Sequence, residues 1–141
     1  MSEAKTFNFE LVSPEEKLIS GPAIMVTVPG DEGDFGVLKG HAAMISSIRA
    51  GVIEIQANDN EEARRIFVAG GFADVSPSNC TVLAEEAVDV QNLSKDDLEQ
   101  TIRNLSEDIG MAKDEHEKGR LEQKLTIAKA KLSAVTGTLV L

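Results

Sequence analysis

Aromatic residues and cysteine are scarce in this sequence of 141 residues, which has five phenylalanines, no tryptophan, no tyrosine and one cysteine, Cys80. A hydrophobic core must therefore be built mainly from valine, isoleucine, leucine and alanine. One cysteine permits no internal disulfide, which fits a reducing compartment. Cys80 lies at the start of a predicted strand with no basic residue nearby in the sequence, so we expect a buried structural thiol rather than a catalytic one.

Positive charge is also limited, because 14 lysines and arginines stand against 24 acidic residues and the formal net charge is -10. This balance argues against a general nucleic-acid binder, which needs a basic face, and against adhesion to anionic lipid through bulk charge. No apolar run approaches membrane-spanning length, and Met1 to Lys5 resembles neither a signal peptide nor a transit peptide. We therefore expect membrane association only through partner proteins.

Sequence motifs of catalysis are missing as well. No glycine-rich loop ends in Gly-Lys-Ser/Thr, and Gly33, Gly36 and Gly40 have the wrong spacing for a dinucleotide fingerprint. His116-Glu117 begins like a zinc-protease motif but has no second histidine after it. We expect no catalytic residue, no metal site, no bound cofactor and thus no enzyme activity of the chain's own.

The part of the chain up to about Val90 has the patterns of strands. Short β-branched or alternating apolar segments are separated by Gly, Pro, Asn and Asp clusters, which typically form turns. Such spacing predicts a β-sandwich or barrel. The segments expected to be strands are 7–13, 23–28, 52–55, 64–69, 72–75 and 81–84, with Gly70-Gly71 as a break or bulge.

After Val90 the period becomes helical. Ser94 is a candidate N-cap with Asp97 at the capping-box position, and two apolar stripes follow. Their phases do not match across 110–119, so we predict two helices packed as an antiparallel hairpin; one long kinked helix is the alternative. The stripes are Leu98, Ile102, Leu105 and Ile109, then Leu121, Leu125, Ala128, Leu132 and Val135.

Charge is unevenly distributed in this helical part. Residues 85–117 carry eleven acids and three bases, whereas residues 118–131 carry five bases and one acid. One interpretation of the basic segment is a solvated face that pairs with the first helix. The other is a docking surface for an acidic partner.

The segment 31–42 has the most unusual local composition, with three glycines and a histidine but few residues typical of strands. It is either a pair of tight turns with glycines at positive φ or a shaped loop that meets a partner closely. Its sequence from Glu32 to Ala42, EGDFGVLKGHA, resembles the epsilon-subunit motif of F-type ATP synthases. Three further blocks resemble that family in the same order: 51–55, the Gly70-Gly71 block and 79–84.

The resemblance runs from about Phe7 to Leu132. It implies an N-terminal flattened β-sandwich of about ten strands, residues 1–90, and a C-terminal two-helix hairpin, residues 91–141. It also implies a non-catalytic rotor subunit, peripheral on the cytoplasmic side of the bacterial inner membrane. The implied partners are the gamma subunit, the c-subunit ring and, transiently, the beta and alpha subunits.

The same resemblance implies functional residues. Asp34 and His41 match the c-ring contact, and Arg120, Lys124 and Lys131 match basic residues that contact beta when the hairpin extends and inhibits ATP hydrolysis. One departure concerns the nucleotide motif that some members carry at the first helix, because Asp97 stands at the position of its phosphate-pairing arginine. A carboxylate there should repel ATP. The alternative function is a stand-alone nucleotide-sensing β module with a regulatory helical tail.

Overall fold

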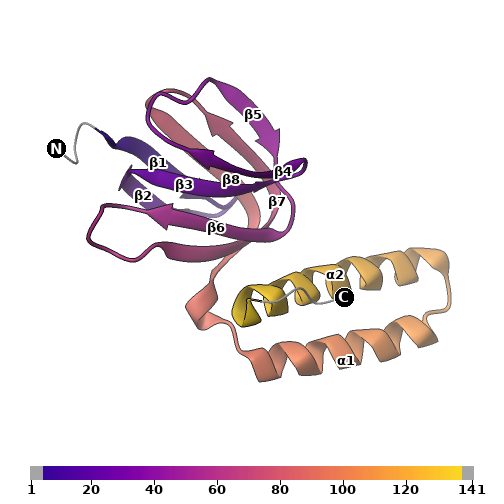
Figure 1. Cartoon of the computed structure of the whole chain (residues 1–141). Coiled ribbons are helices and arrows are strands. Elements are labelled where there is room, and N and C mark those ends of the chain that lie inside the picture. The colour runs from indigo at the N-terminus through magenta and orange to yellow at the C-terminus, as the bar shows by residue number, and fades with distance from the viewer. Residues whose placement is uncertain (1–4, 138–141) are drawn as a thin grey trace. The chain divides into compact units, whose positions relative to one another are not determined.

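The computed structural model describes residues 5–137, which form a β unit followed by a helical unit (Figure 1). The first compact unit ends at Asp89 and the second begins at Val90. Each unit is built around its own apolar contacts and is described by itself below. None of the described helices is both long and apolar enough to cross a membrane.

The β unit contains eight strands in its described part, joined in the order β2-β1-β8-β7-β6-β3-β4, with β5 paired to β7. This confirms the predicted β-sandwich. The strands are β1 (Phe7–Val12), β2 (Lys17–Ala23), β3 (Met25–Gly30), β4 (Gly33–Val37), β5 (Met44–Ser47), β6 (Gly51–Gln56), β7 (Arg64–Val75) and β8 (Asn79–Asp89).

The resemblance implied about ten strands, and two long strands account for the difference from the eight found. The first half of β7 pairs with β6, and its second half pairs with β5. β8 follows β7 along its whole length, but only residues 79–83 of β8 also pair with β1, in parallel. β7 and β8 therefore each place one half in one layer of the sandwich and the other half in the second layer. Counting these halves separately gives ten segments.

The bend in β7 depends on Gly70 and Gly71, which have φ values of 72° and 116°. The pairing register between β7 and β8 is the same before and after this pair, so the glycines bend the ladder without shifting it. An added Cβ at Gly71 would lie 1.8 Å from the backbone oxygen of Leu83. Only glycine fits this position, because it tolerates positive φ and close backbone approach.

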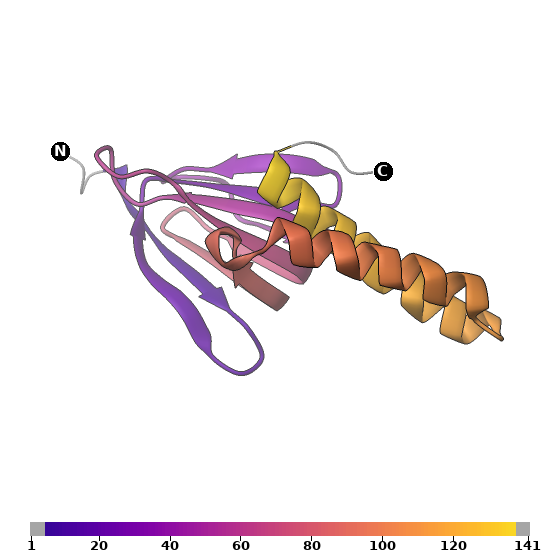
Figure 2. The ribbon, with the colours of Figure 1, turned by 90° about the horizontal axis from the view of Figure 1, so that it is seen from below.

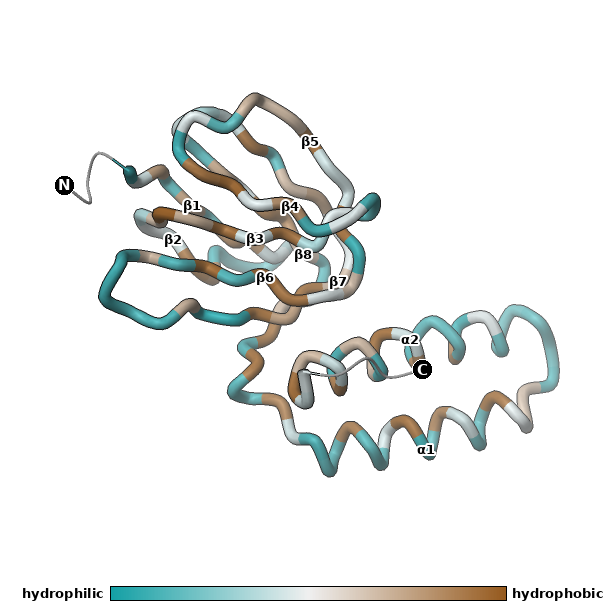
Figure 3. Tube along the Cα trace, in the orientation of Figure 1, coloured by the Kyte–Doolittle hydropathy of each residue, from teal (hydrophilic) through white to brown (hydrophobic). Residues whose placement is uncertain are grey.

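The core lies between the two layers and is filled by alternating residues of the strands. Phe9 and Leu11 of β1, Val28 of β3 and Val82 of β8 are at most 1% exposed. Cys80 belongs to this cluster, which confirms a buried thiol. Burial raises the pKa of the Cys80 thiol to about 11, and the Asp74 carboxylate adds to the shift. Figure 3 shows the apolar strands against the hydrophilic 57–63 connection.

Sequence patterns missed β2, β4 and β5. Segment 31–42 was expected to form either tight turns or a shaped loop, yet Gly33–Val37 within it is a strand paired with β3. β4 and β5 are short, and β4 lies at one end of the sheet order. The exposed residues of β4 include Asp34 and Gly36, whereas β5 exposes Met44 and Ile45, so neither strand shows a regular period of two. Gly33 and Gly40 do adopt positive φ, so the expected glycine turns occur at either end of β4.

The helical unit starts with a 3-10 turn, η2 (Val90–Asn92), and continues with α1 (Lys95–Met111) and α2 (Glu115–Thr136). Ser94 caps α1 as predicted, because its side chain accepts a 3.3 Å hydrogen bond from the Asp97 backbone N–H. Asp114 caps α2 in the same way through the N–H of Glu117, at 2.7 Å. Gly137 ends α2 in the left-handed conformation that glycine favours.

The two helices lie antiparallel and side by side, as both views in Figures 1 and 2 show. This confirms the predicted hairpin and excludes a single kinked helix. Both predicted stripes are buried or half-buried, with Leu98, Leu121 and Leu132 at most 9% exposed. The turn is shorter than expected, since only residues 112–114 separate the helices and both Gly110 and Gly119 are helical.

Candidate functional site

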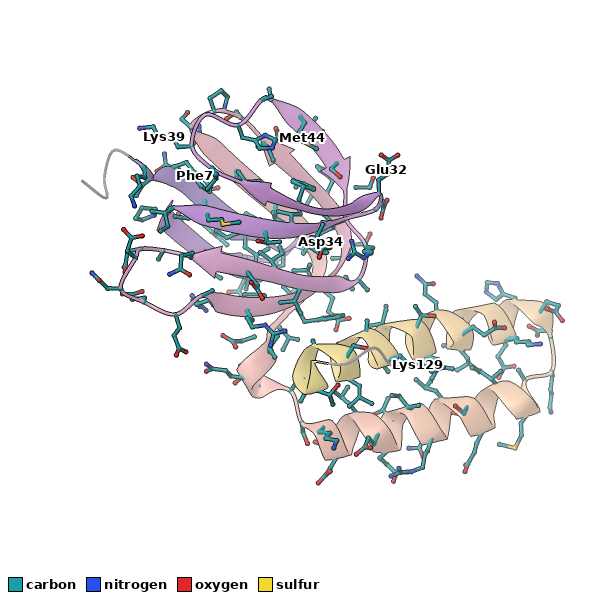
Figure 4. All side chains as sticks on the ribbon, in the orientation of Figure 1. Phe7, Glu32, Asp34, Lys39, Met44 and Lys129 are labelled. Atoms are coloured by element: carbon teal, nitrogen blue, oxygen red, sulfur yellow. The ribbon has the colours of Figure 1, made fainter. Side chains whose placement is uncertain are left out.

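Asp34 lies at the acidic end of the β3–β4 hairpin, next to the exposed turn residues Asp31 and Glu32 (Figure 4). Its side chain is 60% exposed and forms an ion pair with the guanidinium of Arg49. The same guanidinium donates a 2.6 Å hydrogen bond to the carbonyl of Gly30. The sequence motif indicated Asp34, but it gave no sign of its partner 15 residues away.

His41 belongs to the turn after the other end of β4 and is half-buried. Its Nδ1 lies 2.7 Å from the Ala42 carbonyl, and its ring packs at a tilt against Phe35 with centroids 6.5 Å apart. Phe35 and Asp34 are neighbours in a strand, so their side chains point to opposite faces. Asp34 therefore lies on one face of β4, whereas His41 packs on Phe35 of the other face, and the two side chains share no hydrogen bond.

A surface hollow of about 560 Å³ opens beside the acidic turn. Residues 31–35 line one side of it and residues 44–47 line the other. Met44 and Ile45 are 37% and 72% exposed there. The hollow thus combines an acidic rim with apolar walls, which is a suitable surface for a protein contact.

Sequence reasoning missed an apolar row on the outer face of one layer. The strand registers place Val12 of β1 beside Leu83 of β8, and Leu83 beside Phe72 of β7. Phe72 is 47% exposed, and Ile45 lies on the same face of the neighbouring β5, diagonally from Phe72, whose direct partner is Ser47. These four residues, here called the outer apolar row, could have been identified only after the pairing of β1 with β8 was known.

The three basic residues predicted to contact a partner, Arg120, Lys124 and Lys131, lie on α2. At 3.6 residues per turn they fall within about 40° of one another around the helix axis. Arg120 and Lys124 are exposed and form no ion pair with α1 within residues 5–137. Lys131 is half-buried and has an interaction of its own. The interpretation that α2 pairs electrostatically with α1 therefore finds no support at Arg120 or Lys124.

Asp97 is an exposed residue in the first turn of α1, together with Asp96. Acidic side chains there stabilise the helix N-terminus, so this pair has a structural use. Two carboxylates at the same place also make the turn unfavourable for a phosphate.

Comparisons with known proteins give matches to both the β unit and the helical unit. The family model "ATP synthase, Delta/Epsilon chain, beta-sandwich domain" matches residues 6–90, and the model of the C-terminal domain of the ATP synthase epsilon chain matches residues 94–140. An ATP synthase epsilon chain of Rhodospirillum centenum is 50% identical over 94% of this chain and 93% of its own length. One from Rhodospirillum rubrum is 46% identical over 95% and 99%.

Solved structures show the same fold at lower identity. A chain in the Euglena gracilis mitochondrial ATP synthase, solved as OSCP, F1 and c-ring, has a TM-score of 0.81 at 22% identity, covering 92% of this chain and 81% of that one. The two matched family models, in sequence order, and the closely similar relatives together establish the assignment: the chain belongs to the epsilon-chain family of ATP synthases.

Proposed function

We propose that the chain is a non-catalytic rotor subunit in the central stalk of an F-type ATP synthase. The observation that carries the proposal is similarity to epsilon chains over both units at up to 50% identity. In this role the chain links gamma to the c ring, so that ion-driven rotation is coupled to ATP synthesis on other subunits. It would lie on the cytoplasmic side of the bacterial inner membrane and reach the membrane only through the complex.

The outer apolar row is the surface we assign to gamma. A contiguous apolar row outside a completed core stays in water unless a partner covers it. Phe72 is its largest side chain, and burial of an exposed aromatic residue contributes about 1.5–3 kcal/mol. The row is continuous through β5 with the hollow beside the acidic turn, because Ile45 belongs to both. Gamma and the c ring would thus occupy neighbouring surfaces.

Co-purification tests the proposal. A tagged chain, expressed in place of the host subunit, should bring gamma and the c ring with it from detergent-solubilised membranes. Phe72→Glu should lose gamma, whereas Thr27→Glu, on the opposite layer, should keep it. Recovery of the tagged chain without any ATP synthase subunit would contradict the rotor assignment, and retention of gamma by Phe72→Glu would contradict its docking surface.

The two ends of β4, which carry Asp34 and the nearby His41, are proposed to meet the c ring. Asp34→Arg places a second cation beside Arg49, and His41→Ala removes the ring packed on Phe35, so the double variant should disturb the contact while preserving the core. Disturbing two interactions of about 0.5–1 kcal/mol each would weaken the contact about five- to thirtyfold. Proton pumping per ATP hydrolysed, measured in membrane vesicles, should fall.

Asp59→Arg is the matched control, because Asp59 is an exposed aspartate of the same unit that pairs with Lys5 at 3.0 Å. It should leave the pumping ratio unchanged. Normal pumping by the double variant would argue against this face as the c-ring contact.

A stand-alone nucleotide sensor is the second candidate, and ATP affinity distinguishes it. We expect calorimetric titration of the isolated protein with ATP to show no binding, because Asp96 and Asp97 oppose a phosphate at the start of α1. A micromolar dissociation constant, about -8 kcal/mol, would refute this electrostatic argument. The variant Asp97→Arg tests whether the missing arginine is the cause, since it should gain affinity if the rest of the site is present.

A further inference from the structure

The turn between β3 and β4 concentrates negative charge at one point. Gly30 pairs with Gly33, so Asp31 and Glu32 alone form the loop, and Asp34 follows at once. The turn is tight, since a Cβ on Gly30 would lie 2.8 Å from the Gly33 oxygen. Three carboxylates within four positions repel one another, so the turn needs a cation or outside support to hold one shape.

Arg49, 15 residues after Asp34 in the sequence, supplies both the cation and the outside support. Its guanidinium bridges the Gly30 carbonyl, at 2.6 Å, and the Asp34 carboxylate. Its backbone N–H donates a 2.9 Å hydrogen bond to the carbonyl of Pro29. A planar guanidinium can reach a carbonyl and a carboxylate at once, whereas a lysine ammonium acts as a point charge.

Arg49 is itself fixed to the core through its neighbours. Ile48 is 4% exposed, bridges to Gly30, and donates a 3.1 Å hydrogen bond to the Gly71 carbonyl. Ser47 accepts a 3.0 Å hydrogen bond from the N–H of Asp31. Residues 47–49 therefore form a firm base, and the Arg49 side chain extends from it across the hairpin.

We propose that Arg49 is the positioning residue of the acidic turn: it holds Asp34 within the subunit and leaves Asp31 and Glu32 as the carboxylates presented to a partner. The functional part of this inference rests on the proposed c-ring contact. Asp34 then acts through Arg49, by shaping the turn, rather than as a contact residue. Asp31 and Glu32 are exposed and belong to the rim of the hollow, which fits this division.

Amide hydrogen exchange of the isolated full-length protein tests the positioning role directly. Arg49→Ala should speed exchange of the Asp31 N–H by roughly tenfold or more, since a broken charge-assisted bond of about 1.5 kcal/mol corresponds to that factor. Core amides such as those of Phe9 and Val82 should not change. Arg49→Lys should lie between Ala and wild type, and Asp34→Asn combined with Arg49→Ala should add little to Arg49→Ala alone.

Arg65→Ala is a matched control. Its side chain is 42% exposed against 45% for Arg49, and it pairs with Glu54 at 3.6 Å without bridging a turn. It should leave exchange at Asp31 unchanged. Equal exchange in Arg49→Ala and wild type, or an equal rise in Arg65→Ala, would overturn the positioning role.

Coupling measurements separate this inference from the proposed function. In vesicles, Arg49→Ala should lower proton pumping per ATP hydrolysed, and so should Asp31→Asn combined with Glu32→Gln. If exchange at Asp31 rises but neither variant changes pumping, Arg49 is confirmed as the positioning residue and the c-ring assignment of the turn is wrong. If Asp34→Asn lowers pumping while exchange at Asp31 stays slow, Asp34 is a direct contact and the division of roles fails.

Discussion

Gly71→Ala is expected to prevent the β unit from folding or to lower its free energy of unfolding by more than about 4 kcal/mol, which is exceptional for one methyl group. Two costs combine at this position. A φ of 116° strains any residue with a Cβ, at about 1–3 kcal/mol. The new Cβ would also lie 1.8 Å from the Leu83 backbone oxygen, which can retreat only by separating β7 from β8.

Two other glycines separate these costs. Gly40 has a φ of 89° but open space around it, so Gly40→Ala should show the conformational cost alone, about 1 kcal/mol or somewhat more. Gly21 has neither positive φ nor a close neighbour, and Gly21→Ala should change stability by no more than about 0.5 kcal/mol. Urea unfolding followed by circular dichroism measures all three. A Gly71→Ala protein as stable as Gly40→Ala would show that β7 and β8 can separate at little cost in free energy.

Removing the helical hairpin is expected to raise ATP hydrolysis by the assembled complex. The hypothesis is that the hairpin extends and its basic residues Arg120, Lys124 and Lys131 contact acidic surface on the beta subunits. A protein ending at Val90 keeps every residue of the β core, so it should still assemble. Three contacts with beta of about 0.5 kcal/mol each in the extended state would sum to about tenfold in the inhibited population.

Charge variants show whether the basic face is responsible. Replacing Arg120, Lys124 and Lys131 together by glutamine should reproduce most of the truncation effect at low salt, and added salt should reduce the difference. Lys118 and Lys129 lie roughly opposite this face of α2, so their replacement by glutamine is the matched control. If truncation leaves hydrolysis unchanged at low and high salt, the hairpin is not an inhibitor and its basic face is only solvated.

Extension must also overcome the packing of the hairpin. Leu121, Ala128 and Leu132 are buried or nearly so, and they lose their cover if the helices separate. Exposing each large apolar residue costs about 1.5–3 kcal/mol, which is more than the stabilisation that one surface ion pair contributes. Extension is therefore favourable only where partner subunits supply new apolar contacts.

The sequence predicted elements whose burial pattern is regular. Phe7, Phe9 and Leu11 alternate because one face of β1 is buried, and the α1 and α2 stripes recur because each helix packs along one side. The cap at Ser94 was also predictable, since it needs only local chemistry. The resemblance to epsilon subunits added the family and the motif around Asp34.

Features that depend on pairing between distant residues could not be predicted. The edge strand β4 contains two glycines and an aspartate, which hide the alternation of apolar and polar residues. Its strand conformation comes from pairing with β3. The Arg49–Asp34 ion pair and the outer apolar row join residues that only the sheet topology brings together. The sequence pattern likewise divided β7 into the segments 64–69 and 72–75, because it could not show that Gly70 and Gly71 bend one continuous strand.

The parallel pairing of β1 with β8 sets the order in which the nascent polypeptide folds. Asn8 pairs with Asn79, 71 residues later, so the first strand has no partner on that side until the last strand leaves the ribosome. Contacts of such long sequence separation slow folding, because a large loop must close before they form. The α1–α2 hairpin is made of local contacts and is synthesised last. We therefore expect slow closure of the β unit and fast formation of the helices in stopped-flow refolding followed at strand and helix wavelengths.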